Sequence, residues 1–271
     1  MQLTPRARFG AALAYGVLAM VATFELLRDA FANKLVAALR TGTGDCVINW
    51  LGARAWQRGI DVYSPEGLRW AGLPSFGHPP TTPLWYLPFT AYGIFELNQV
   101  YGHLLILMLL VHCVLLAAEL RAPVALVTGL FAFALVSDTS WWANHVAMIQ
   151  ISEPIAFLYL LAWLFLRRDH ETLAGVMVGL ALSLKLYAGL LVVMLLVGRR
   201  WRGAGAAVAT YLVFAIAATW RFGFACWGEF AKMLPATQNY WTAHIRNAGV
   251  QGIVLRWWWP SCQQRGGVLP A

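Results

Sequence analysis

Asp45 is the residue of this sequence best placed to act as a general base. It follows the first long apolar stretch of the chain, in the segment TGTGDCVINWLGARAWQRGIDVYSP (41–65). A carboxylate in such a position can take a proton from a hydroxyl group. The alternative is structural, because an aspartate in front of a helix often caps its N-terminus. Spacing alone favours the cap.

Lys185 is the second residue with a chemical argument of its own. It interrupts the apolar stretch 173–198, and a lysine at membrane depth is costly unless something compensates its charge. One interpretation is that the ammonium snorkels to the surface or pairs with an acid. The functional interpretation is a contact with an anionic group at membrane depth, such as a phosphate, helped by backbone N–H groups at a helix break.

The segment 138–151 and the cysteines offer weaker candidates. Within 138–151, His145 could bind a polar ligand or simply lie at an interface. The four cysteines show no CxxC spacing, and we expect no metal site and no cofactor. Cys46 and Cys226 could pair if they share one side of a membrane, and the sequence leaves this open.

The composition indicates what must hold these residues in place. Of 271 residues, 60% are hydrophobic and only 12% are charged, and 14 are tryptophan. A soluble protein of this size needs a more polar exterior, whereas a lipid bilayer removes that need. The net charge of +8 comes from basic pairs between apolar runs, which is typical of membrane topology. With no recognition motif, we expect no nucleic-acid partner.

The apolar segments predict an all-α polytopic membrane protein. A spanning helix needs about 20 apolar residues, and residues 47–57 predict a short amphipathic helix lying at the surface. Six or seven embedded segments are expected, from the apolar stretches 9–27, 83–97, 100–120, 124–136, 154–166, 173–198 and 203–220.

Basic residues set the expected sidedness. Arg167–Arg168 and the cluster Arg199, Arg200 and Arg202 should both face the cytoplasm. The stretch between them must then enter and leave on the same side. It is too short for two spans, so we predict two half-helices that break near Lys185. Asp45 and the segment 138–151 would then be periplasmic.

Four motifs occur in an order that resembles a known family. Asp45 precedes an aromatic-rich helix and the turn GIDVY (59–63), and the proline-rich HPPTTPL (78–84) follows. The third motif, GLALSLKLY (179–187), precedes RRWR (199–202). The fourth is NAGVQG (247–252) with Arg256, where Gly249 replaces the family's serine. In this order they resemble glycosyltransferase family 87 (DUF2029) of the GT-C superfamily.

The resemblance implies a fold and a reaction. The fold would be a GT-C-like transmembrane helix bundle with a long first periplasmic loop, in a bacterial inner membrane. The reaction would be inverting transfer of a mannose-like hexose from a polyprenyl-phosphate sugar to a hydroxyl of a glycan or glycolipid acceptor. Asp45 would be the general base. Substrate binding would involve Lys185, His145, Asn144, Gln150, Asn247, Arg256, Tyr63 and His78.

Two alternatives stay open. Broken helices and an embedded lysine also suit a transporter or lipid flippase, although such a protein does not need the long aromatic loop that contains Asp45. The family normally continues with more spans, so residues 1–256 are expected to form a single, incomplete transmembrane domain, and 257–271 an atypical polar tail. On that interpretation the chain would be an inactive, truncated fragment.

Overall fold

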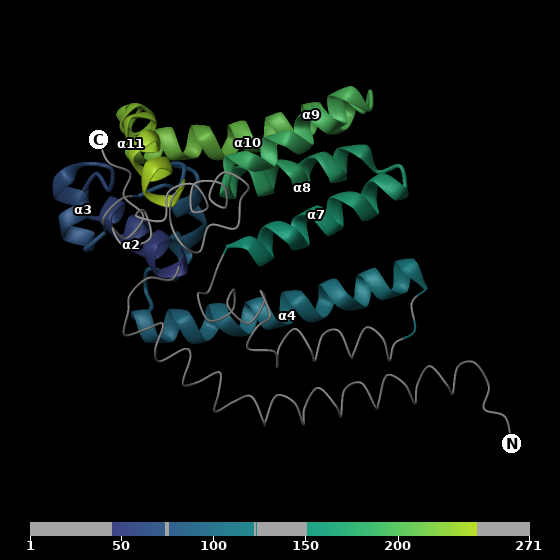
Figure 1. Ribbon diagram of the computed structural model, residues 1–271, viewed down its shortest axis with the longest axis horizontal. Helices are drawn as coiled ribbons and strands as arrows, with labels where there is room; N and C mark the ends of the chain where they lie inside the picture. Colours follow the sequence, from purple (N-terminus) through teal and green to yellow (C-terminus); the bar gives the residue numbers. More distant parts are fainter. Residues whose placement is uncertain (1–44, 74–75, 122, 124–150, 243–271) are drawn as a thin grey trace, which may run out of the picture.

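The computed structural model describes residues 45–73, 76–121, 123 and 151–242 (Figure 1). Within these ranges the regular elements are all helical, which confirms the predicted helical class. The predicted segments 9–27 and 124–136 lie outside the described residues. The elements are α2 (Asp45–Gln57), α3 (Pro65–Ala71), η1 (Thr82–Phe89), α4 (Ile94–Leu120), α7 (Ser152–Arg167), α8 (Glu171–Leu184), η2 (Leu186–Ala188), α9 (Gly189–Val197), α10 (Trp201–Phe222) and α11 (Ala225–Thr242).

The longer helices form a layer of roughly aligned rods, with α4, α7, α8 and α10 in succession (Figure 1). The helices α2, α3 and α11 gather at one end of these rods. The connections α7–α8 and α9–α10 lie together at the other end, where Arg200 forms ion pairs with Asp169 and Glu171. The two predicted basic clusters therefore share one end of the molecule.

Two described helices are long and apolar enough to cross a membrane, judged by length and composition. They are residues Val100–Leu120 of α4 and all of α10. The predicted apolar segment 83–97 contains parts of two elements. Residues Thr82–Phe89 form a 3-10 helix, and α4 begins at Ile94, where Glu96 Oε2 accepts a hydrogen bond from the Gly93 N–H at 3.0 Å.

The predicted break at Lys185 is confirmed. Helix α8 ends at Leu184, Lys185 has extended backbone angles (φ −149°, ψ 132°), and η2 leads into α9. The chain reverses there, so α9 returns to the end at which α8 began (Figure 1). Both ends of this hairpin therefore lie at the same end of the molecule.

Small residues let α8 and α10 approach closely. A Cβ atom added at Gly175 would overlap the backbone of Gly203, and one added at Gly179 would overlap Ala207 and Thr210. Glycines at this four-residue spacing are typical of tightly packed helix pairs in membranes. The contact holds the Lys185 hairpin against α10.

Helix α2 is confirmed as a helix, and other helices cover much of it. Its buried residues Cys46, Trp50 and Ala53 belong to a core cluster with residues of η1, α4, α7 and α8. Trp56 joins a second cluster beside Phe230 of α11. Apolar residues on both faces of α2 are covered by other helices, so it forms an internal support for the residues around Asp45.

Candidate functional site

The two residues singled out for chemistry meet in space. Asp45 Oδ2 lies 3.7 Å from Lys185 Nζ, and their side chains are 23% and 27% exposed. Ion pairs at this degree of exposure contribute about 0–1 kcal/mol to stability. The pair is therefore a weak one, and both groups are accessible to a ligand.

Asp45 is the first residue of α2, yet its carboxylate makes no capping hydrogen bond to a described backbone N–H. The cap favoured from spacing alone is thus absent among these residues, and the carboxylate is directed to Lys185. One turn later, Asn49 Nδ2 donates a hydrogen bond to the Asp45 carbonyl oxygen at 2.8 Å. Asn49 is fully buried, and its Oδ1 has no hydrogen-bond partner in the described part of the chain.

Two threonines hold the end of α8 that carries Lys185. The hydroxyl of Thr81 donates to the Ser183 carbonyl at 2.7 Å, and that of Thr82 donates to the Leu184 carbonyl at 2.8 Å. The last carbonyls of a helix lack intrahelical partners. The proline-rich segment thus caps α8 from a distant part of the sequence and sets the position of Lys185.

His78 lies just before these threonines, outside both candidate spans. It is buried, and its Nδ1 has no hydrogen-bond partner among the described residues. Burial lowers the pKa of His78 to about 4, while the Asp45 charge raises that pKa and the Lys185 charge lowers it. The imidazole is therefore neutral at neutral pH, and both charged groups of the pair influence it.

Tyr63 packs in the core and contacts the segment that carries His78. It is almost fully buried, and its hydroxyl donates a hydrogen bond to the His78 carbonyl oxygen at 2.6 Å. Its contacts are those of a core residue, with its ring against Trp56, Phe76 and Phe230. Tyr63 is one of the predicted substrate-binding residues, and its hydrogen bond to the His78 carbonyl connects it to the site.

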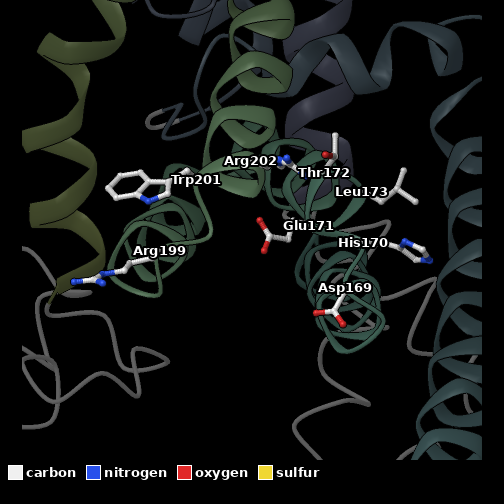
Figure 2. Close-up of a pocket in the computed structure, with 8 residues that line it drawn as sticks. All are labelled: Asp169, His170, Glu171, Thr172, Leu173, Arg199, Trp201 and Arg202. Carbon is white, nitrogen blue, oxygen red and sulfur yellow. The ribbon is translucent and has the colours of Figure 1, made fainter.

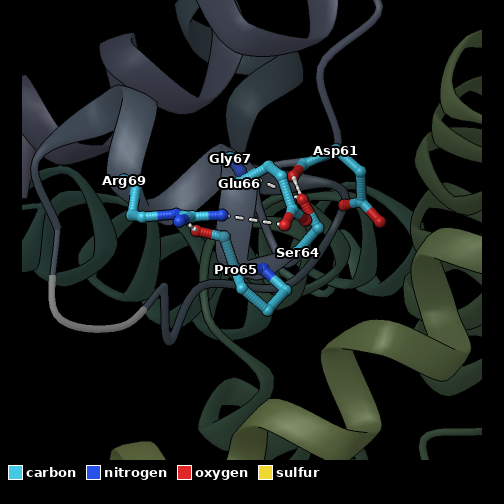
Figure 3. A network of polar contacts seen from close by, with 6 residues as sticks. All are labelled: Asp61, Ser64, Pro65, Glu66, Gly67 and Arg69. Atoms are coloured by element: carbon cyan, nitrogen blue, oxygen red, sulfur yellow. Dashed lines mark hydrogen bonds and ion pairs between the residues drawn. The ribbon is translucent and has the colours of Figure 1, made fainter.

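Polar side chains fix the chain at GIDVY and at the start of α3, and Figure 3 shows the contacts of Ser64 with Asp61 and Gly67. Asp61 Oδ1 accepts a hydrogen bond from the Tyr63 N–H at 3.0 Å, and the Ser64 hydroxyl donates to the Asp61 carbonyl at 2.8 Å. The Ser64 side chain also accepts from the Gly67 N–H and so caps α3. Such side-chain turns are usual for Asp and Ser.

The comparisons with known proteins place this geometry in a family. The model of glycosyltransferase family 87 matches residues 76–269, which is more than half of the chain. The chain belongs to glycosyltransferase family 87. Membership implies a glycosyltransferase, which uses a sugar donor and an acceptor. No curated protein and no solved structure matches the chain.

The family 87 match covers only part of the site. His78, Thr81, Thr82 and Lys185 lie within the matched residues, whereas Asp45 precedes them. The approach of Asp45 to Lys185 is thus a structural observation that the family match does not supply.

Five predicted substrate-binding residues lie outside the described residues. They are Asn144, His145, Gln150, Asn247 and Arg256. Within the described ranges, no group of three or more His, Cys, Asp or Glu side chains gathers as a metal site would. Cys46, Cys113 and Cys226 are free thiols, so the structure does not pair Cys46 with Cys226.

Sequence reasoning missed several residues that shape the site of this family 87 member. The predicted helix began at residue 47, whereas α2 begins at Asp45. A prediction that started the helix at Asp45 would have placed Asn49 one turn later on the same face. Nothing local marks Thr81 and Thr82 as partners of Ser183 and Leu184, because these contacts join segments 102 residues apart. The contact of Trp85, whose Nε1 donates to Ser183 Oγ at 3.0 Å, was equally unpredictable from the local sequence.

Proposed function

We propose that the protein transfers a hexose from a polyprenyl-phosphate donor to an acceptor hydroxyl, with Asp45 as general base and Lys185 as the ligand of the donor phosphate. The observation that carries the proposal is the 3.7 Å approach of these two side chains at a helix break. A transferase needs a cation for the leaving phosphate and a base for the incoming hydroxyl, and the pair supplies both.

Lys185 is placed to bind the donor. Its ammonium is partly exposed, and it pairs only loosely with Asp45. A donor phosphate carries negative charge and competes with Asp45 for the same ammonium. Binding of the donor would therefore release the carboxylate, while Lys185 stabilises the charge that grows on the phosphate as its bond to the sugar breaks.

Asp45 then receives the acceptor proton. The acceptor oxygen attacks the anomeric carbon and its proton moves to the Asp45 carboxylate. The bond between the anomeric carbon and the phosphate oxygen breaks, and polyprenyl phosphate leaves. One direct displacement inverts the anomeric centre. The phosphate is a good leaving group, so the step does not need a second carboxylic acid, unlike the paired carboxylates of glycosidases.

His78 is proposed to contact the sugar or the acceptor. A buried nitrogen without a partner costs about 1–3 kcal/mol, and Nδ1 of His78 has none among the described residues. The neutral imidazole can accept a hydrogen bond from a sugar hydroxyl at that nitrogen. Tyr63 would position His78 through its hydrogen bond to the His78 carbonyl. Additional contacts are proposed from Asn144, His145, Gln150, Asn247 and Arg256.

The proposed site faces the periplasm of a multi-pass inner-membrane protein. Lys185 lies where α8 turns back, and the Arg199–Arg202 cluster lies at the opposite end of the same hairpin (Figure 1). Because arginines collect on the cytoplasmic side, this separation supports a periplasmic position for Asp45. Two described helices have the length and composition of membrane spans.

The experiment that tests this function uses the full chain, purified and reconstituted in lipid vesicles. A polyprenyl-phosphate hexose with a labelled sugar is supplied together with candidate glycan and glycolipid acceptors. We expect labelled product with polyprenyl-phosphate sugar and none when a nucleotide sugar replaces it. Movement of intact donor across the vesicle membrane without product would instead favour a flippase.

A further inference from the structure

A pocket of about 510 Å³ lies at the end of the molecule away from Asp45, where the α7–α8 and α9–α10 connections meet (Figure 2). It plays no part in the proposed transfer reaction. The polar and aromatic residues around it are Asp169, His170, Glu171, Arg199, Trp201 and Arg202.

The charges around this pocket leave two arginines without an acidic partner. Arg200 Nη1 lies 2.7 Å from Glu171 Oε1 and 3.6 Å from Asp169 Oδ1, so one arginine serves both acids. Arg199 and Arg202 are exposed, and neither makes an ion pair with a described residue. Three arginines and two carboxylates give the pocket region one net positive charge, which favours an anion.

An exposed apolar stripe runs along α9 toward the same end. Leu190, Val193, Met194 and Val197 follow the spacing of one helix face and are between 53% and 79% exposed. Trp201, at the start of α10, is 65% exposed beside the arginines. The stripe is apolar along α9 and ends at a tryptophan and arginines. Residues follow the same order where lipid acyl chains meet the head groups of a bilayer.

We propose that this pocket binds the head group of an anionic phospholipid. Its phosphate would pair with the guanidinium groups of Arg199 and Arg202, and Arg199, which extends away from Arg202 in Figure 2, would turn toward it. An acyl chain would follow the α9 stripe. A guanidinium suits a phosphate because it offers several N–H donors in one plane. The inference rests on the proposed membrane embedding, but it requires neither a sugar donor nor activity. It gives the hairpin that carries Lys185 a fixed depth in the bilayer.

The test is native mass spectrometry of the detergent-purified full chain. Phosphatidylglycerol and phosphatidylcholine with the same acyl chains are added separately, and retained lipid is counted. We expect preferential retention of phosphatidylglycerol. Retention should fall about fivefold in R199Q and in R202Q, since each guanidinium in contact with the lipid phosphate is expected to contribute about 1 kcal/mol.

Arg121→Gln is the matched control. Arg121 is exposed at the C-terminus of α4, and its backbone φ of 51° is close to the 55° of Arg199, so both substitutions remove one charge from a left-handed position. It does not line the pocket. R121Q should retain phosphatidylglycerol as the unmodified chain does.

Three outcomes would overturn the inference. They are equal retention of both lipids, an equal loss in R121Q and R199Q, or competition by soluble glycerol phosphate that removes all phosphatidylglycerol. Carbonate extraction of cell membranes distinguishes a failure of the membrane embedding from a failure of the lipid site. A chain released by carbonate contradicts the membrane embedding itself, whereas a retained chain without lipid preference contradicts only the pocket.

Discussion

The Lys185 ammonium lies 3.7 Å from the Asp45 carboxylate, at the point where α8 stops and the chain turns back. The first residue of one helix thus meets the residue that ends another. The contact joins two residues for which the sequence offered both a chemical and a structural interpretation.

Lys185→Met should weaken donor binding while the protein stays in the membrane. Charge-assisted hydrogen bonds are worth about 1.5–3 kcal/mol, so affinity for a polyprenyl-phosphate sugar should fall about 10- to 100-fold. Titration of the reconstituted protein with a fluorescent donor measures this. Lys232→Met is the control, because Lys232 is exposed and pairs with Glu229 within α11. Unchanged donor affinity in K185M would leave snorkelling as the better account of Lys185.

The double substitution Thr81→Val and Thr82→Val should destabilise the protein and displace Lys185. Each valine keeps the shape of threonine and leaves one carbonyl of α8 without its hydroxyl donor. Each lost bond costs about 1–3 kcal/mol, and donor affinity should fall with it. Thermal unfolding and donor titration report the two effects.

Thr210→Val is the control for this pair. It also removes a hydroxyl bonded to a carbonyl, that of Ala206 at 2.8 Å, but within α10. A double variant that unfolds like T210V and keeps full donor affinity would show that the threonines do not position Lys185.

His78 should make the folded protein sensitive to mild acid. Its folded pKa of about 4 lies below the usual 6.5, so the unfolded chain binds the proton more readily. The stability is complete above pH 6.5 and is lost as pH falls toward 4. From pH 7 to pH 5 the loss should be about 2 kcal/mol. H78Q should lose that part of the pH dependence in unfolding measurements, and an identical pH profile in both proteins would argue against it.

Gly179→Ala should loosen the hairpin. The added methyl group meets the Ala207 carbonyl and the Thr210 side chain of α10, and overpacking of this kind costs about 1–3 kcal/mol. Gly205→Ala, on α10, meets nothing within 4 Å and should be neutral or stabilising by up to about 1 kcal/mol. The unfolding midpoints of the two variants are compared with that of the unmodified protein. Equal effects of the two substitutions would contradict the close packing of α8 on α10.

The sequence predicted the helices better than it predicted their contacts. Long apolar runs identified α4, α7 and α10, and the two arginine clusters located the break at Lys185, because hydropathy and topology act along the chain. The surroundings of α2 were not predictable in this way, since its apolar residues suit burial against protein as well as against lipid. Helices α3 and α11 were also not predicted, because neither is a long apolar run.

The sequence identified some residues of the site but not the contacts between them. Asp45 and Lys185 stood out by residue type and position, but their meeting depends on the chain reversal and on Thr81 and Thr82, which act across 102 residues. Tyr63 was predicted to bind substrate, whereas its buried hydroxyl, which donates to the His78 carbonyl, indicates a positioning role. Burial of this kind follows from the tertiary fold.

Sugar transfer by Asp45→Asn tests the central claim most directly. Asparagine keeps the size of the side chain and can still cap a helix, but it cannot accept the acceptor proton. The account predicts that D45N and D45A both lose transfer by at least about 10²- to 10⁴-fold, while donor binding survives. Asp61→Asn is the control, because an amide oxygen can still accept the Tyr63 N–H in that turn. Full transfer by D45N, with D45A merely less stable, would contradict a catalytic Asp45.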